Sequence, residues 1–124
     1  MAGISTYLSD KYLDCLVNAS GFNVAAVYIQ LHTGDPGSAG TANVAGNNVR
    51  KAVSFAAASA ESKASSADIT WTSVSTTETY AYVSLWDASS SGNYLWSGPL
   101  TAPESVSAGN TFTLTSGLLT VGLS

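Results

Sequence analysis

The chain has 124 residues and a mass of 12.6 kDa, which fits one domain and excludes a multidomain assembly. Charged residues make up 10% of it, well below the roughly 25% of an average soluble protein. The net charge is −4, and 20 Ser and 13 Thr supply most of the polar side chains. The 4 basic residues cannot form a stripe that neutralises a run of phosphates, so nucleic acid is not an expected partner.

The cysteine content and the distribution of apolar residues exclude further classes of protein. The single cysteine, Cys15, excludes an internal disulfide framework and a cysteine-based zinc cluster. No segment approaches the roughly 18 consecutive apolar residues of a membrane span, and the N-terminus lacks a basic segment followed by an apolar one. We therefore expect no membrane partner and no secretory signal.

The first predicted element is one short amphipathic helix from Thr6 to Asn18. Apolar residues recur there at helical spacing, opposite a polar stripe that includes Asp10 and Asp14. Ser5 or Thr6 can cap its first amides, and Gly21 is the expected left-handed stop. The apolar positions are Leu8, Tyr12, Leu13, Leu16 and Val17.

After Gly21 the apolar pattern changes to a period of two, which predicts strands. The first strand covers residues 25–32, and a polar, glycine-rich loop follows it to about Asn48. The second strand covers residues 49–57. We expect the Ala/Ser-rich stretch from Ala58 to Ala67 to be a mobile loop or an irregular edge strand, because its serines compete for backbone hydrogen bonds and it has no apolar stripe.

The second half of the chain predicts further short strands separated by turns. A strand at 69–74 precedes one at 79–86, and a hairpin loop at 87–93 leads into a strand at 94–97. We expect Pro99 and Pro103 to break this last ladder. After a turn at 108–110, strands are predicted at 111–115 and 118–123.

This pattern predicts an all-β fold, an antiparallel β sandwich or jelly roll with one short N-terminal α-helix. It forms a single domain over residues 1–124, with a helical arm at 1–20 and the β sandwich at 24–124. The predicted core residues are Val27, Ile29, Leu31, Val53, Phe55, Val83, Leu85, Phe112, Leu114 and Val121.

The corner after the first strand concentrates residues that favour turns. Pro36 fixes its own φ, and Gly34 and Gly37 accept positive φ, so the chain must turn there. The Asp35 carboxylate is placed to accept amides from Gly37 or Ser38. We interpret the only histidine, His32, as a strand-end residue that hydrogen-bonds this loop.

No arrangement of residues points to catalysis. His32 has no nucleophile or second ligand at a suitable spacing, and Asp87 at a strand end is expected to accept turn amides. Calcium is the one metal worth weighing, because a single loop offers four oxygen donors, but the loop lacks alternating acidic ligands. These donors are Asp35, Asn43, Asn47 and Asn48. We therefore expect no metal, no cofactor and no enzymatic activity.

An aromatic set is the most informative feature, because hairpin pairing would place its rings side by side on one face. The N-terminal helix could cover that face through Leu8, Tyr12 and Leu16, or the face could form a subunit interface in a homo-oligomer, with a trimer expected. A sugar-binding platform is the third alternative. The set consists of Tyr80, Tyr82, Trp86, Tyr94 and Trp96.

Several stretches carry a family resemblance that spans nearly the whole chain. They read MAGISTYLSDKYLD, VYIQLHTGDPGSAGTANVAG, RKAVSFAAAS, VSLWDASSSGNYLWSGPLTAP and VSAGNTFTLTSGLLTVGL. The sequence resembles a family of small structural proteins in the virions of tailed bacteriophages, especially those of actinobacteria. LHTGDPG and the segment LWDASSSGNYLWSGPLTAP are the most specific parts.

The resemblance implies an all-β fold and no enzymatic activity. It implies a capsid decoration protein, made in the host bacterial cytoplasm, whose partners are the major capsid protein and further copies of itself on the outer capsid surface. A minor tail or tail-fibre component is the alternative within the virion. A carbohydrate-binding adhesin module is the alternative of a different class.

Overall fold

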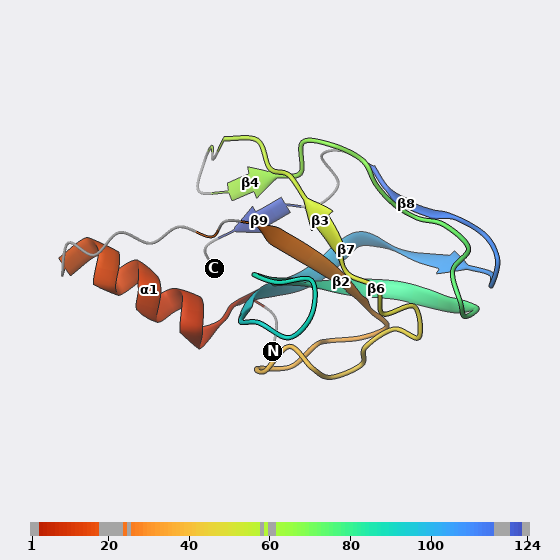
Figure 1. The fold of residues 1–124 in the computed structure, drawn as a ribbon, viewed down its shortest axis with the longest axis horizontal. Helices are drawn as coiled ribbons and strands as arrows, with labels where there is room; N and C mark the ends of the chain where they lie inside the picture. Colours follow the sequence, from red (N-terminus) through yellow and green to blue (C-terminus); the bar gives the residue numbers. More distant parts are fainter. Residues whose placement is uncertain are drawn as a thin grey trace.

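The computed structural model describes residues 3–17, 24, 26–57, 59, 62–115 and 120–122. Within these residues the chain forms one α-helix and a set of strands whose pairings are all antiparallel, so the predicted all-β class is confirmed (Figure 1). No helix in the described part is long and apolar enough to cross a membrane. The elements are β1 (Gly3–Ile4), α1 (Thr6–Val17), β2 (Val27–His32), β3 (Lys51–Val53), β4 (Ser62–Ala64), β5 (Ile69–Trp71), β6 (Glu78–Trp86), β7 (Tyr94–Val106), β8 (Phe112–Leu114) and β9 (Thr120–Gly122).

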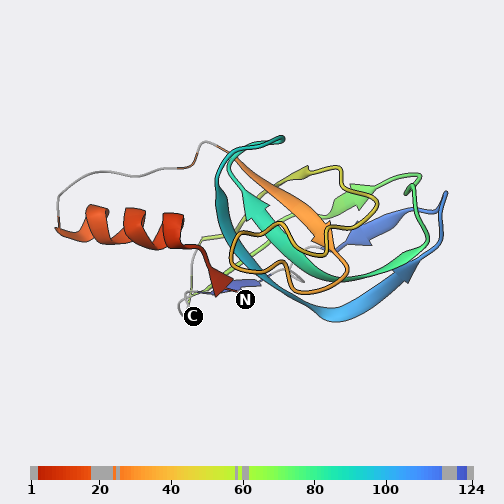
Figure 2. The same ribbon diagram turned by 90° about the horizontal axis from the view of Figure 1, so that it is seen from below.

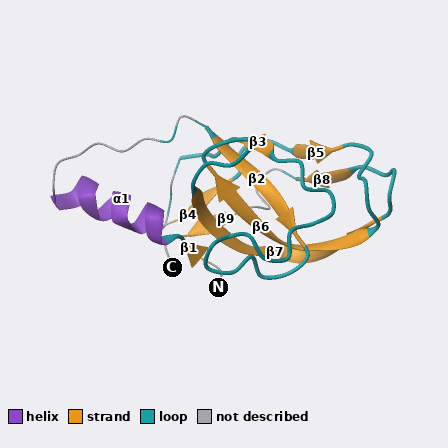
Figure 3. Cartoon of the chain, turned by 60° about the horizontal axis from the view of Figure 1, so that its bottom comes forward, coloured by secondary structure: helices purple, strands orange, loops and turns teal. Residues whose placement is uncertain are grey.

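The strands form one large and two small sheets. The five-stranded sheet has the order β1-β7-β6-β2-β3, and the pairs β4-β9 and β5-β8 form the two small ones. The centre of the large sheet is the β2–β6 pair, in which Ile29 lies opposite Leu85 and Leu31 lies opposite Val83. Their side chains share a core cluster with Trp71 of β5. Figure 3 shows α1 at one end of this β body.

Most of the predicted core residues are buried where expected. Val27 and Phe55 are partly buried and pack against the core from its margin. Val121 lies in β9, but its side chain is outside the described residues. The predicted residues that are buried are Ile29, Leu31, Val53, Val83, Leu85, Phe112 and Leu114.

The helix begins where the sequence predicts. The Ser5 Oγ accepts a hydrogen bond from the backbone N–H of Leu8 at 3.1 Å, which makes Ser5 the N-cap residue. β1 ties the chain just before this cap to Trp96 and Ser97 of β7. The predicted helix end at Asn18 and the stop at Gly21 lie outside the described residues.

The alternative in which the helix covers the aromatic rings through Leu8, Tyr12 and Leu16 is wrong for the later turns of the helix. Only Tyr7 and Leu8, in the first turns, pack against the core, whereas Tyr12 is 47% exposed and Leu16 is 81% exposed. The reason is visible in Figure 2, where α1 extends away from the β body, so that its later turns lie beyond the sheet.

The two prolines do not end the strand, because β7 continues through both of them to Val106, but the predicted break of the ladder is present, since the register with β6 shifts between Pro99 and Glu104. Pro99 lies opposite Tyr82, and Glu104 lies opposite Tyr80, so residues 100–103 of β7 face the single residue between those tyrosines. This bulge includes Pro103. On its other side β7 pairs only with the two residues of β1, so its prolines sit at an edge and a bulge, where the missing N–H is tolerated.

The Ala/Ser-rich stretch contains an edge strand, one of its two predicted forms. β4 pairs with β9, and Ser65 forms an isolated bridge with Phe55. Ala58, Ala60 and Glu61 are outside the described residues. The second predicted strand is shorter than expected, since β3 ends at Val53.

Candidate functional site

Polar side chains are buried on the face of the large sheet that looks away from Ile29 and Leu31. Across β2 and β6, Gln30 lies opposite Ser84, and Tyr28 lies opposite Trp86. The segment 33–50 folds over this face, because the chain returns after His32 to form a bridge between His32 and Val44. We call this group, together with the half-buried Arg50, the polar cluster. Its buried members are Gln30, His32, Ser84 and Trp86.

A chain of hydrogen bonds joins three members of the polar cluster to the covering segment. The Trp86 Nε1–H donates to the Ser84 Oγ at 2.7 Å, and the Ser84 Oγ lies 2.7 Å from the His32 Nε2. The His32 Nδ1 lies 2.8 Å from the carbonyl oxygen of Ala42. Both ring nitrogens of His32 therefore have partners, and the histidine connects the sheet to the segment above it.

Burial keeps this histidine neutral. It lowers the pKa of His32 below its ordinary value of 6.5, because the charged ring would lose its hydration. Hydrogen bonds from the ring to the backbone of Ala42 and Asn43 oppose this effect, and the positive charge of Arg50 adds a small lowering of the same pKa. A neutral ring suits a site in which one nitrogen accepts and the other donates.

The adjacent serine and histidine do not present a reactive group to a substrate. Ser84 and His32 are both fully buried, and the Ser84 Oγ already accepts the Trp86 indole N–H. Among the described residues, no three His, Cys, Asp or Glu side chains gather as a metal site. The hydrogen bonds of Ser84 and His32 instead hold segment 33–50 against the sheet.

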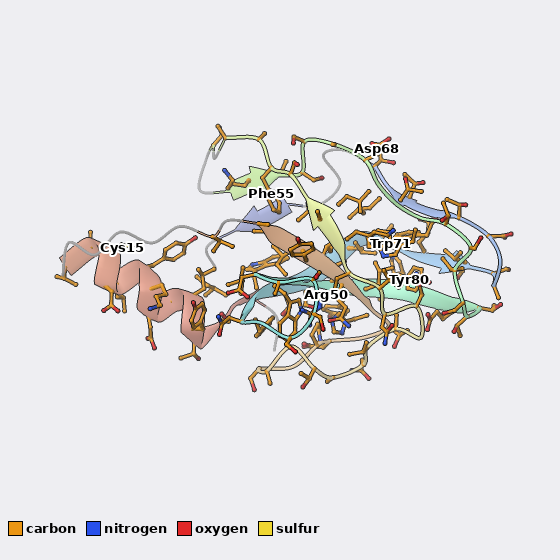
Figure 4. The ribbon with its side chains drawn as sticks, in the orientation of Figure 1. Cys15, Arg50, Phe55, Asp68, Trp71 and Tyr80 are labelled. Atoms are coloured by element: carbon orange, nitrogen blue, oxygen red, sulfur yellow. The ribbon has the colours of Figure 1, made fainter. Side chains whose placement is uncertain are left out.

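Arg50 holds the hairpin loop between β6 and β7. Its Nη1 donates to the carbonyl oxygens of Ala88 at 2.9 Å and Ser91 at 2.7 Å, and its Nε donates to the Gln30 Oε1 at 3.3 Å. The guanidinium carbon lies 4.1 Å from the centroid of the Trp86 ring, a cation–π distance. Figure 4 shows Arg50 beside the hairpin, in the segment that leads into β3.

The hairpin loop is also braced from within. The two Asp87 carboxylate oxygens accept the backbone N–H of Asn93 at 2.7 Å and its side-chain amide at 2.9 Å. These bonds lower the pKa of Asp87, because they stabilise its charged form. The loop tip carries the exposed residues 89–93, with positive φ at Ser91 and Gly92. Asp87 thus has the turn role that the sequence predicts.

The corner after β2 is built by the residues expected there. The Asp35 Oδ1 accepts the backbone N–H of Gly37 at 2.9 Å, and Gly37 has a φ of 79°. Pro36 is fully buried, and Gly34 lies against the side chain of Asn43. The Asn43 amide donates to the Asp35 carbonyl oxygen at 2.9 Å, so it serves the loop fold.

Gly40 lies where the loop after β2 contacts Tyr94, the residue that follows the hairpin loop 87–93. A Cβ on Gly40 would lie 2.6 Å from the nearest ring carbon of Tyr94, the first residue of β7. The loop that contains Gly40 therefore rests directly on that ring. The exposed residues of segment 33–44 and of loop 87–93 form neighbouring parts of one surface, which we call the loop face.

Sequence reasoning missed Arg50 and Glu78. The Glu78 carboxylate accepts the backbone N–H of Gly46 at 2.9 Å and of Asn47 at 3.0 Å, which anchors the end of the covering segment. Only 10% of the residues are charged, so each charged residue at the end of a strand is noteworthy. The position of Arg50 and Glu78 at strand ends was the signal in the sequence that could have indicated a role in holding loops.

The aromatic rings are divided between environments, so the prediction that all five share one face is wrong. Leu85 lies opposite Trp96 and Trp86 lies opposite Tyr94, which leaves Leu95 as an extra residue in β7. This bulge places Trp96 with Leu85 in the core and Tyr94 on the face of Trp86.

Burial also separates these rings from an external partner. Tyr80 is fully buried and packs against Phe112 with ring centroids 5.0 Å apart, while Trp86 and Trp96 are each 7% exposed. Only Tyr82 and Tyr94 are half-buried. A sugar-binding platform of exposed rings is not formed by this set, and an interface role for Tyr82 and Tyr94 stays a prediction.

Comparison with known families identifies the group to which the sequence belongs. The sequence matches the family described as podophage GP4 fiber I protein gp80 over residues 3–122, nearly its full length. The chain belongs to this family. No curated protein matches it.

Membership of the gp80 family makes the chain a bacteriophage virion protein with a structural role. This confirms the phage virion part of the resemblance seen in the sequence. The actinobacterial phage group and the capsid decoration role are not part of the match, and they stay predictions. In this gp80-family protein, hydrogen bonds from His32, Arg50 and Asp87 hold the loops of the loop face.

Proposed function

We propose that this protein is a structural component of a fibre on the phage particle. The observation that carries the proposal is the family match, which covers residues 3–122 and names a fibre protein. A fibre component was the alternative to capsid decoration in the sequence analysis. The family name favours the fibre over the capsid shell.

The construction of the loop face supports a role as an exposed building block. Arg50 hydrogen-bonds the carbonyl oxygens of Ala88 and Ser91, Asp87 hydrogen-bonds Asn93, and His32 hydrogen-bonds Ala42, so these three side chains hold two surface loops. Loops fixed before binding lose little conformational entropy when they contact a neighbouring protein. A repeated structural subunit benefits from such surfaces because every copy must make the same contacts.

The location of the protein on the particle tests the proposal. Antibodies against the full chain, carrying gold label, are applied to intact particles, to separated tails and to tailless heads for electron microscopy. We expect label on fibres and on separated tails. Label spread over tailless heads would overturn the fibre role and support a decoration protein bound to the major capsid protein.

Copy number provides a second readout. Quantitative mass spectrometry of purified particles compares this chain with the major capsid protein and with a tail protein. We expect a ratio to the tail protein that is a small whole number. A ratio to the major capsid protein near one would contradict the proposal.

A further inference from the structure

The first part of the covering segment lies directly over His32. We call residues 34–43 the flap. The backbone N–H of Ala42 donates to the carbonyl oxygen of Pro36 at 2.9 Å, a hydrogen bond that joins the two arms of the flap to each other. In Figure 1 the chain after β2, drawn in orange, runs below β2 and β6, whereas β8 lies above them. The flap therefore has internal structure that does not depend on its contact with the sheet.

Hydrogen bonds at the base of the flap join it to the end of β2. The backbone N–H of Thr33 donates to the carbonyl oxygen of Asn43 at 2.9 Å, and the His32 Nδ1 lies 2.8 Å from the carbonyl oxygen of Ala42. Just beyond the flap, Ala45 is buried in the core, and its backbone N–H donates to the sheet. The chain is therefore fixed on both sides of the flap, and His32 holds the part between them.

The flap can leave the sheet without disturbing the core. Side chains alternate between the two faces of a strand, so His32 lies on the face of β2 opposite to Ile29 and Leu31, which belong to the core cluster. Opening the flap would expose the buried Pro36 and the ring of His32 to water, but the pairing of β2 with β6 would stay intact. Such an opening is local and costs less than unfolding of the whole chain.

The site under the flap suits a neutral histidine and not a charged one. A neutral ring donates from one nitrogen and accepts at the other, whereas a protonated ring donates from both. The Ser84 Oγ lies 2.7 Å from the His32 Nε2 and already accepts the Trp86 Nε1–H, so a proton on Nε2 would leave the Ser84 hydroxyl hydrogen without its acceptor. The ring would also carry its charge in a buried site.

The surroundings of the ring do not compensate a positive charge. Among the described residues, both partners of the ring nitrogens are uncharged, and the charged group that acts on the ring is the positive Arg50. On β6, Tyr82 lies opposite His32, and on the flap the Asp35 carboxylate accepts the backbone N–H of Gly37. The titratable or charged side chains on the elements around the ring are Asp35, Arg50, Glu78, Tyr82, Asp87 and Tyr94.

We infer that protonation of His32 shifts the flap toward an open form while the strands stay folded. In the open form the ring is in water and has the ordinary histidine pKa of 6.5, whereas the pKa of the closed ring is lower. The equilibrium constant for opening therefore stays at its minimum above pH 6.5 and rises as the pH falls below that value. The flap carries part of the loop face, so acid would release that part from its fixed position. The inference does not depend on whether the protein sits on a fibre or on the capsid.

Hydrogen exchange of single backbone amides, measured by NMR on the full chain, tests the inference, because a protection factor reports how rarely a hydrogen bond opens. The Thr33 N–H is bonded across the base of the flap. Between pH 7.5 and pH 5.5 we expect its protection factor, corrected for the intrinsic effect of pH on exchange, to fall by up to about tenfold. Addition of about 1 M urea should leave it nearly unchanged, because a local opening exposes little surface.

The hairpin loop supplies a matched control within the same molecule. The Asn93 N–H is bonded to the Asp87 carboxylate, whose pKa is below its ordinary value of 3.8, so this bond should keep the same protection at both pH values. In a His32→Gln variant the protection of Thr33 should also be the same at both pH values. An equal fall in parent and variant, or no fall in the parent, would overturn the inference.

The parent alone keeps the inference testable if His32→Gln does not fold. Amides at the centre of the β2–β6 pair exchange only when the strands separate. We expect these amides to be much better protected than Thr33, and their protection should fall steeply with urea. If Thr33 had the same protection and the same urea dependence as these amides, the flap would open only with the whole fold, and the inference would be wrong.

Discussion

The His32 Nε2 and the Ser84 Oγ lie 2.7 Å apart with both side chains fully buried, and the other contact of the histidine ring determines which of the two donates. The His32 Nδ1 faces the Ala42 carbonyl oxygen, which can only accept, so Nδ1 carries the proton of the neutral ring and donates it. The His32 Nε2 then accepts the Ser84 hydroxyl hydrogen, while the Ser84 Oγ accepts the Trp86 Nε1–H. The neutral Nδ1–H form is therefore built into the fold.

The first prediction concerns pH. The folded-state pKa of His32 is below 6.5, so the unfolded chain takes up a proton near pH 6.5 while the folded chain does not. The free energy of unfolding should be at its full value above pH 6.5. It should fall below that pH, by about 1.4 kcal/mol per pH unit, until the folded pKa is reached. Urea unfolding between pH 8 and pH 5 measures this slope.

The chain has one histidine, so a His32→Gln variant serves as the control. Its free energy of unfolding should be lower overall and nearly independent of pH over the same range. A parent whose stability does not change between pH 7 and pH 5.5 would contradict the assigned burial of a neutral ring.

The second prediction concerns Ser84. A Ser84→Ala change leaves the Trp86 Nε1–H and the His32 Nε2 without their shared partner in a buried site. Each unsatisfied buried group costs about 1–3 kcal/mol, so we expect a large loss in the free energy of unfolding. Ser90→Ala, at an exposed position of the hairpin loop, should change it by less than about 0.5 kcal/mol. Equal effects of the two changes would argue against the hydrogen-bond chain.

The third prediction concerns the guanidinium of Arg50. Lysine keeps the charge but cannot reproduce the planar donor geometry that reaches two carbonyl oxygens and stacks on Trp86. In Arg50→Lys we expect faster amide hydrogen exchange in residues 88–93, measured by mass spectrometry, and a lower melting temperature. Lys63→Arg, at an exposed position in β4, should leave exchange in the hairpin loop unchanged. Unchanged exchange in both variants would show that Arg50 does not hold the loop.

The fourth prediction separates two costs of replacing a glycine. Gly40 and Gly109 have φ values of 73° and 88°, but a Cβ on Gly40 meets the Tyr94 ring, whereas a Cβ on Gly109 has nothing within 4 Å. Gly109→Ala should therefore cost about 1 kcal/mol of backbone strain. Gly40→Ala should cost that amount plus the displacement of the ring, and thermal unfolding should show the larger loss. A smaller loss at Gly40 would mean that the loop does not rest on Tyr94.

The sequence determined much of the local structure. Alternation of apolar residues placed Ile29, Leu31, Val83 and Leu85 in the core, because side chains of a strand point to opposite faces with a period of two. The helix start at Ser5 and the hydrogen bond from Gly37 to Asp35 also follow from local rules, since each involves residues within three positions of one another.

The tertiary structure decided what depends on distant neighbours. A bulge at Leu95 sends Trp96 into the core and leaves Tyr94 beside Trp86, and the hydrophobic pattern alone does not show where an extra residue enters a ladder. Arg50 can hold the hairpin loop only because folding brings that loop close to it. The hydrogen bond from Arg50 to Ser91 joins residues that are 41 positions apart in the chain. The exposure of Leu16 depends on where α1 extends relative to the sheet. Local periodicity records which side of an element is apolar, but only packing determines whether the protein's own core or another molecule covers it.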